Sequence, residues 1–195
     1  MMNKNLVLIA LAASLWAGGA HAIPILYSAT LTGPAEDPPN ASPGTGTALV
    51  EYDPDAHTLS LDVDFMDLLG TTTVAHIHCC TVDPGTGTVA PATTVPTFVG
   101  FPIGVTAGSF DALLDLTLAS SFNPAFIGAG TIGEAEAALA AGLASGRAYF
   151  NIHTTEFAGG EIRGFLTTVP EPATLSLLGL GLGVLVAARR KVQVR

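Results

Sequence analysis

Apolar and polar residues alternate in short runs along the middle of this 195-residue chain, and glycine, proline and aspartate separate the runs. In the clearest run Leu59, Leu61, Val63 and Phe65 occupy every second position, with serine or aspartate between them. Because successive side chains of a β-strand point to opposite faces, this pattern predicts a strand with one buried and one solvated face. Several such runs joined by turn-forming residues indicate an antiparallel β domain.

The same pattern predicts further strands over residues 25–31, 46–52, 97–101 and 110–118, and a closing hairpin made of residues 147–153 and 161–166. Residues 133–144 differ, because alanine, leucine and glutamate predominate there and this segment contains no β-branched residue. Such a composition favours a helix. We therefore expect a mainly β domain with one short helix packed across an end or edge of the sheet.

The N-terminus has the composition of a processing signal. Residues 1–22 combine an early lysine, an apolar stretch and the sequence Ala20-His21-Ala22. These are the three parts of a secretory signal peptide. We expect cleavage after Ala22 and a domain that extends over residues 23–168.

The C-terminus predicts a membrane segment. Residues 172–188 are seventeen consecutive uncharged residues, followed by Arg189, Arg190, Lys191 and Arg195. That length is near the lower limit of about 17–25 residues for a membrane-spanning helix, which we place at about residues 173–188. The basic cluster behind it predicts a cytoplasmic C-terminus, with the domain on the other side of the membrane.

Charge is distributed unevenly. Residues 23–169 contain two basic residues, Arg147 and Arg163, and fifteen acidic ones, a net charge of −13 with histidine neutral. A surface this acidic repels phosphate backbones, so we expect no nucleic-acid partner. Solubility outside the cytosol is the simplest explanation of this charge, and cations or basic partners are the alternative.

Residues 73–80, with the sequence Thr-Val-Ala-His-Ile-His-Cys-Cys, contain the most chemically capable side chains of the chain. In a strand, two histidines at alternate positions lie about 7 Å apart on one face and are able to hold one metal ion. Imidazole with thiolate or carboxylate suits zinc or copper. The metal hypothesis therefore takes as ligands His76, His78 and the distant His153, with Glu161, Cys79 or Cys80 in the fourth position.

A second hypothesis needs no metal. The three histidines then hydrogen-bond to Asn151, Glu161, Arg163 or backbone carbonyls and join two strands. Glu161 and Arg163 share a face of the predicted return strand, so an ion pair across the hairpin is a simpler interpretation than a binding site that includes Arg147. His57, at the mouth of a predicted turn, is expected to be an exposed bystander.

The two cysteines are adjacent, at positions 79 and 80. Neighbouring Cα atoms lie about 3.8 Å apart, below the usual span of about 4.4–6.8 Å for a disulfide. A bond between these cysteines therefore requires a strained ring. Three states remain open: two free thiols, a redox-labile vicinal disulfide, and thiolate ligands beside the histidine pair.

Catalytic motifs do not stand out. The sequence contains no Gly-x-Ser-x-Gly elbow, no His-Glu-x-x-His and no phosphate-binding loop. We therefore expect a structural or binding module and not an enzyme.

The C-terminal tail, residues 169–195, resembles the PEP-CTERM sorting signal of Gram-negative bacteria. The resemblance rests on Pro170, Glu171 and Pro172, on the apolar span, and on Arg189, Arg190 and Lys191. It implies recognition by an exosortase in the inner membrane and cleavage near Pro170, Glu171 and Pro172. Together with the predicted signal peptide and the basic cluster, we expect processing by signal peptidase and a transient inner-membrane anchor with the domain on the periplasmic side. The resemblance also implies release to the envelope or to an exopolysaccharide matrix.

Residues 27–166 resemble the CHRD domain, named for the vertebrate protein chordin. The matching segments are residues 27–33 with Glu36, Pro38 and Pro39, and then residues 46–48, 59–61, 75–78, 149–154 and 159–164. The resemblance implies an antiparallel β-sandwich or barrel, immunoglobulin-like or superoxide-dismutase-like. We therefore expect a secreted structural or binding module that meets exopolysaccharide or another envelope protein. A copper- or zinc-binding protein is the alternative.

Overall fold

The computed structural model describes residues 22–170. The predicted signal peptide, apart from its last residue, and the predicted transmembrane helix at about residues 173–188 lie outside the described residues. Among residues 22–170, no helix combines the length and the apolar character needed to cross a membrane.

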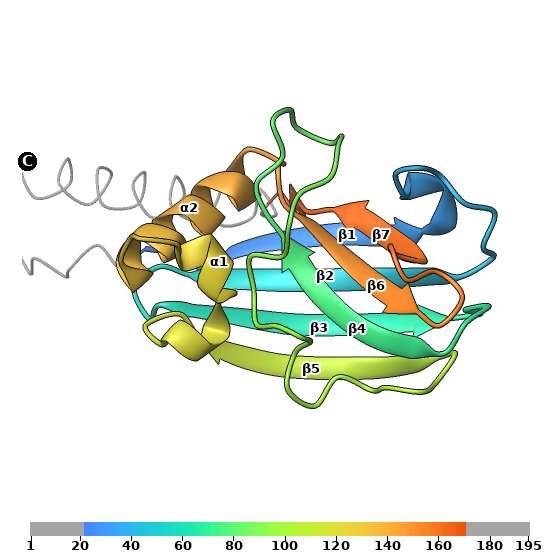
Figure 1. Ribbon diagram of the computed structural model, residues 1–195. Coiled ribbons are helices and arrows are strands. Elements are labelled where there is room, and N and C mark those ends of the chain that lie inside the picture. The colour runs from blue at the N-terminus through green and yellow to red at the C-terminus, as the bar shows by residue number, and fades with distance from the viewer. Residues whose placement is uncertain (1–21, 171–195) are drawn as a thin grey trace, which may run out of the picture.

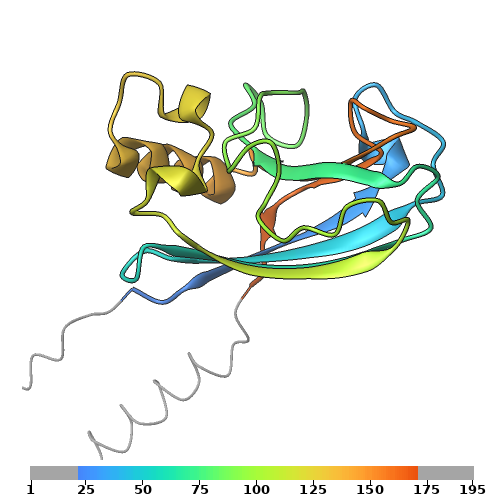
Figure 2. The ribbon, with the colours of Figure 1, turned by 60° about the horizontal axis from the view of Figure 1, so that its bottom comes forward.

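One antiparallel sheet of eight strands curls into a half-barrel (Figures 1 and 2). The strand order is β4-β6-β7-β1-β2-β3-β5, and the short β8 pairs with β1. The strands are β1 (Ile25–Thr32), β2 (Thr45–Asp53), β3 (Thr58–Met66), β4 (Thr72–His78), β5 (Gly108–Asp115), β6 (Tyr149–Thr154), β7 (Ile162–Phe165) and β8 (Thr167–Thr168). The prediction of a mainly β, antiparallel domain is confirmed.

The helices η2 (Ala119–Ser121), α1 (Pro124–Ile127) and α2 (Ile132–Ala144) lie at one end of the half-barrel (Figure 2). The short η1 (Gly33–Ala35) lies at the opposite end, beside β7. Of these only α2 is longer than four residues, so the prediction of one short helix over residues 133–144 is confirmed. A capping box between Thr131 and Glu134 satisfies the first backbone N–H groups of α2.

The predicted strand over residues 97–101 is wrong. Phe98 and Phe101 are buried, but the backbone between them forms a turn in which Phe101 N–H donates to the Phe98 carbonyl. Gly100 has a φ of +83°, which no strand accommodates. The two rings instead enter the core, where Phe98 stacks on Phe110 and Phe150. The apolar composition therefore indicated burial and not strand geometry.

The hydrophobic core lies on the inner face of the curled sheet. One face of β4 and β6 packs against this core, and the opposite face carries their polar side chains. Ala75 and Ile77 of β4, with Phe150 and Ile152 of β6, are completely buried against the core. Because strand side chains alternate, the neighbours of these residues point to the outer face. The histidines of both strands are among those neighbours.

Helix α2 is attached to the β2–β3 turn through the buried carboxylate of Glu136. This carboxylate accepts a hydrogen bond from the Tyr52 hydroxyl at 3.0 Å and contacts the His57 ring at 3.0 Å. Burial and the bond to Glu136 raise the pKa of Tyr52 to about 12. The expectation that His57 is a bystander is therefore wrong, because its half-exposed ring helps to hold the helix.

Strand β7 approaches β1 so closely that position 164 accepts only glycine. A Cβ added at Gly164 would collide with the Thr30 carbonyl oxygen, a backbone atom that cannot move aside. We expect Gly164→Ala to lower the free energy of unfolding by roughly 1–3 kcal/mol, measured by urea denaturation. The matched control is Gly133→Ala on α2, where the methyl group meets nothing within 4 Å and is expected to raise stability by up to about 1 kcal/mol. Equal effects at both positions would contradict this packing.

Candidate metal centre

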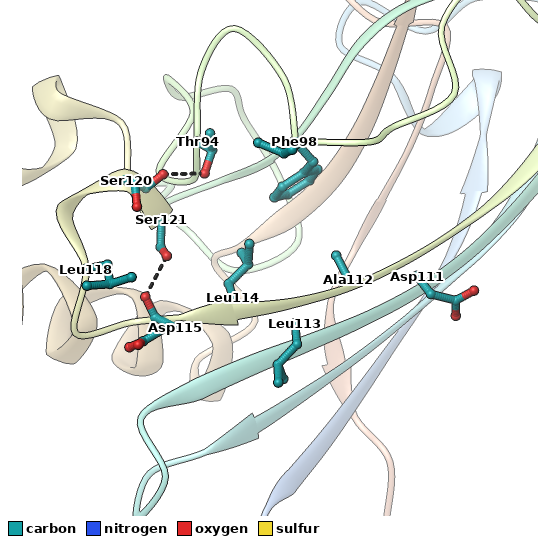
Figure 3. Close-up of a pocket in the computed structure, with 11 residues that line it drawn as sticks. Thr94, Phe98, Asp111, Ala112, Leu113, Leu114, Asp115, Leu118, Ser120 and Ser121 are labelled. Atoms are coloured by element: carbon teal, nitrogen blue, oxygen red, sulfur yellow. Dashed lines mark hydrogen bonds between the residues drawn. The ribbon is translucent and has the colours of Figure 1, made fainter.

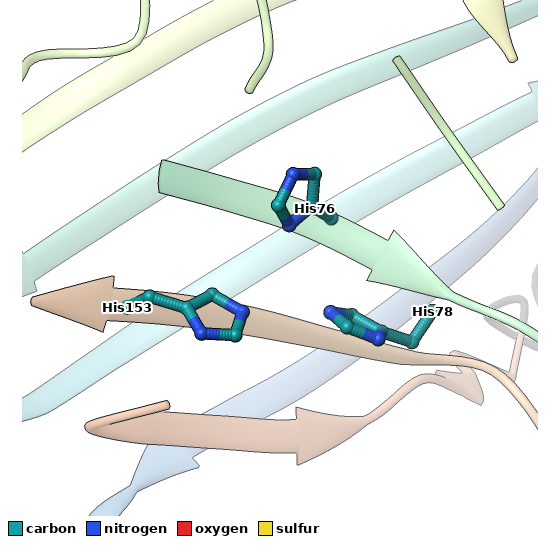
Figure 4. Close-up of side chains that lie close together, drawn as sticks. All are labelled: His76, His78 and His153. Carbon is teal, nitrogen blue, oxygen red and sulfur yellow. The ribbon is translucent and has the colours of Figure 1, made fainter. Parts of the chain in front are cut away.

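Three histidines converge on the outer face of the β4–β6 pair (Figure 4). The register places His76 opposite Asn151 and His78 opposite Tyr149, while His153 lies opposite Val74, two residues beyond Asn151. All three pairs of ring centroids are 5.6–5.7 Å apart. One nitrogen of each ring lies within 4.8 Å of the other two. The structure thus brings together histidines separated by about seventy-five positions in the sequence.

One nitrogen of each imidazole contacts a backbone carbonyl oxygen in a loop. His76 Nε2 lies 2.6 Å from the Pro96 oxygen and His78 Nδ1 lies 2.7 Å from the Val89 oxygen. His153 Nδ1 lies 3.0 Å from the Ala158 oxygen. A carbonyl oxygen only accepts hydrogen bonds, so the ring nitrogen that faces it carries the hydrogen. In the neutral ring the remaining nitrogen therefore carries a lone pair.

Burial keeps these rings neutral. The three side chains are 5–9% exposed, and burial lowers the pKa of all three. The effect is largest at His78, where the pKa falls to about 4 although the bond to Val89 opposes the shift. At neutral pH all three imidazoles are consequently available as metal ligands, which must be deprotonated.

The three lone-pair nitrogens are His76 Nδ1, His78 Nε2 and His153 Nε2. Each is fully buried and has no hydrogen-bond partner among the described residues. Buried polar atoms are normally paired, and each unpaired one has a cost. A metal ion held by the three imidazoles would supply a partner for all three nitrogens together. In a tetrahedral zinc site the ligand nitrogens are about 3.4 Å apart, so the three rings, which each have one nitrogen within 4.8 Å of the others, would have to move closer together to hold an ion.

Glu161 is not placed as the fourth ligand. Its carboxylate already accepts four hydrogen bonds, from the hydroxyls of Ser42 and Thr154 and from the backbone N–H groups of Leu69 and Gly70. Burial acts to raise the pKa of Glu161, but these four donors together lower it. The carboxylate therefore fastens the β6–β7 turn to the loop before β4.

The two cysteines do not join the histidines as thiolates. Cys79 and Cys80 form a disulfide with each other, which selects the second of the three states left open by the sequence. Within residues 22–170, the cluster of potential ligands around the site contains only the three histidines.

Arg163 pairs with Glu36 and not with Glu161, so the predicted ion pair across the hairpin is wrong. Its Nε lies 3.8 Å from a Glu36 carboxylate oxygen, and both side chains are buried. The guanidinium also lies over the Tyr149 ring at 4.9 Å. On its other side, Tyr149 stacks on His78 with ring centroids 4.8 Å apart. A buried column of Arg163, Tyr149 and His78 thus fixes the plane of one potential ligand.

Sequence reasoning missed the groups that orient the histidines. Pro96, Val89 and Ala158 contribute backbone oxygens, which leave no side-chain signal in a sequence. Tyr149 was visible as a residue on the same face as His153, but its stacking on His78 depends on the strand register.

A groove of about 490 Å³ lies elsewhere, beside the edge strand β5 (Figure 3). Leu113, Leu114 and Leu118 contribute to its lining, and the Thr94 hydroxyl donates to the Ser120 carbonyl at its border. None of the three histidines lines it.

The metal-free protein is expected to lose stability as the pH falls. The ordinary pKa of histidine is 6.5, whereas folded His78 has a pKa of about 4. Between these values the unfolded chain binds more protons, so acid favours unfolding by roughly 3 kcal/mol for this residue. His78→Gln should remove that share of the loss, measured by urea denaturation at pH 7 and pH 4 with chelator present.

Glu36 acts in the opposite direction in the same pH range, because burial raises its pKa to about 7. Its contribution is common to both proteins and cancels in the comparison. An identical loss of stability in the wild type and His78→Gln would show that His78 is not buried as a neutral ring.

Comparisons with known proteins identify two parts of the chain. The CHRD domain model matches residues 27–166, and the PEP-CTERM protein-sorting motif matches residues 168–191. No curated protein and no solved structure matches the chain. Both predicted resemblances are confirmed, and the sorting motif marks a secreted protein that an exosortase processes after anchoring at the membrane. Since the first match covers most of its length, this chain belongs to the CHRD domain family.

Proposed function

We propose that the exported domain binds one zinc or copper ion through His76, His78 and His153. One observation carries this proposal: three neutral imidazoles lie together with one nitrogen of each ring within 4.8 Å of the others, and the nitrogen of each ring that does not face a carbonyl has no partner among the described residues. Each ring is held in that orientation by a backbone carbonyl. Metal-ligating histidines are typically held in this way.

The chemistry of the donor set selects the class of ion. Three imidazole nitrogens suit zinc and copper, whereas calcium and magnesium prefer oxygen ligands. A site with three protein ligands keeps its fourth position for water or for an outside ligand, unlike structural zinc sites, which have four. Because the three nitrogens are buried, we propose that a water molecule fills this fourth position.

The proposed setting follows from the sorting motif. We propose that residues 23–168 form the mature domain and that cleavage by the exosortase occurs near Pro170, Glu171 and Pro172. Arg189, Arg190 and Lys191 would hold the transient anchor on the cytoplasmic side, with the domain in the periplasm. The proposed place of action is the cell envelope or its exopolysaccharide matrix, where polysaccharide or another envelope protein is the partner.

Metal binding is tested with the exported protein, stripped by chelator and dialysed against Zn²⁺ or Cu²⁺. The wild type is expected to retain about one ion per chain, measured by elemental analysis, because one cluster of three imidazoles is present. His153→Gln should lower the affinity for the ion at least tenfold, since it leaves only two imidazoles.

The matched control is His57→Gln, which removes a histidine that contacts Glu136 and is not part of the cluster, and it should leave metal binding unchanged. Substoichiometric metal in the wild type, or equal losses in both variants, would overturn the proposed centre. In that case the carbonyl-bonded histidines serve only to fasten three loops to the sheet.

Processing is tested by the intact mass of the protein recovered outside the cell. Cleavage after Ala22 and near Pro170 is expected, which removes both terminal segments and leaves a species of about 147 residues. A mass that retains the C-terminal basic cluster would contradict exosortase cleavage, and a mass that retains residues 1–22 would contradict the signal peptide.

A further inference from the structure

The Cys79–Cys80 disulfide lies at the joint between the histidine cluster and the loop that orients it. His78 is the last residue of β4, and the disulfide begins at the next residue. The chain then continues into residues 81–96, whose Val89 and Pro96 carbonyls hold His78 and His76. A change in the geometry of the disulfide would therefore move His78, which precedes it. It would also move the loop after it, whose carbonyls orient His78 and His76.

Helix α2 packs tightly against both sulfur atoms. A Cβ added at Gly142 would collide with the Sγ atoms of Cys79 and Cys80, and the Cys79 side chain is 2% exposed. Immediately after the disulfide, Thr81 N–H donates to the Arg147 carbonyl at 3.0 Å, just beyond the end of the helix. The sulfurs consequently have no space to move toward α2.

We propose that the redox state of Cys79 and Cys80 controls metal affinity at the three-histidine centre, an inference that rests on the proposed function. Reduction by a phosphine breaks the S–S bond. The phosphine takes up the oxygen of one water molecule and becomes a phosphine oxide. The two hydrogens of that water go to the sulfur atoms, which become two thiols. The sulfurs then move from about 2.05 Å apart to a non-bonded distance on the order of 3.5 Å.

Gly142 blocks one side and the Cys79 side chain is buried, so in our proposal the backbone at positions 79 and 80 moves to accommodate this separation. That backbone is continuous with His78, so the displacement moves a proposed ligand and the loop that holds its ring. Loss of such orienting contacts typically weakens metal binding 10–100-fold. The oxidised protein is therefore the tight-binding state and the reduced protein is the weak-binding state.

The opposite effect has an equally definite physical basis. Two thiols released beside His78 become thiolates in the presence of a metal ion, and thiolates are strong zinc ligands. If they reached the site, reduction would strengthen binding instead. The direction of the change thus separates control through the backbone from direct ligation by sulfur.

The test measures Zn²⁺ affinity of the exported protein by competition with a coloured chelator, before and after reduction by a phosphine. Alkylation followed by intact-mass measurement counts the thiols in each sample. We expect the dissociation constant for Zn²⁺ to rise at least tenfold on reduction. Cys79→Ser/Cys80→Ser should bind as weakly as the reduced wild type and should not respond to the phosphine, with circular dichroism as the check on folding.

Each outcome decides the matter. Equal affinity in the two states overturns the redox linkage and leaves the metal centre standing. Tighter binding on reduction, with a sulfur-to-metal charge-transfer band when Co²⁺ replaces Zn²⁺, shows direct thiolate ligation and overturns control through the backbone. Absence of binding in both states overturns the proposed function together with this inference. If the double variant does not fold, the two states of the wild type decide alone.

Discussion

The pairing of β4 with β6 is the constraint on which the site depends. In this antiparallel register His76 lies opposite Asn151, and His153 follows two residues later on the same face. A shift by one residue would turn the histidines of one strand into the core. The completely buried Ala75, Ile77, Phe150 and Ile152 oppose such a shift, because they would then leave the core. Apolar packing on the inner face thus sets the positions of the imidazoles on the outer face.

The outer face is unusual because so many of its polar groups are buried. Asn151, Glu36 and Arg163 lie beside the histidines, and all are at most 5% exposed. The loops that cover them provide backbone acceptors: Arg163 donates to the Ala35 and Gly87 carbonyls at 2.6 and 3.1 Å. Ion pairs and hydrogen bonds of this kind offset the cost of burial without adding much net stability. The buried polar groups therefore support the binding role that we propose.

Much of the fold could be predicted from the sequence, because alternation in β3 and helix-forming composition in α2 are local signals. The sharing of a face by His76 and His78 follows from strand periodicity alone. The contribution of His153 required two distant strands to pair, which the sequence left as a hypothesis because no local signal fixes strand pairing. Glu161 and Arg163 were assigned to one face, yet Glu161 turns toward Ser42 and Thr154 while Arg163 lies over Tyr149. The irregular backbone before β7 carries no signal in residue type, so this difference could not be predicted.

The most direct measurement of the central claim is X-ray absorption at the metal edge of the loaded, oxidised protein. The account predicts nitrogen neighbours at about 2.0–2.1 Å with the multiple-scattering pattern of three imidazoles, and no sulfur. A sulfur neighbour at about 2.3 Å, or a shell of oxygen atoms without imidazole scattering, would contradict a centre made by His76, His78 and His153.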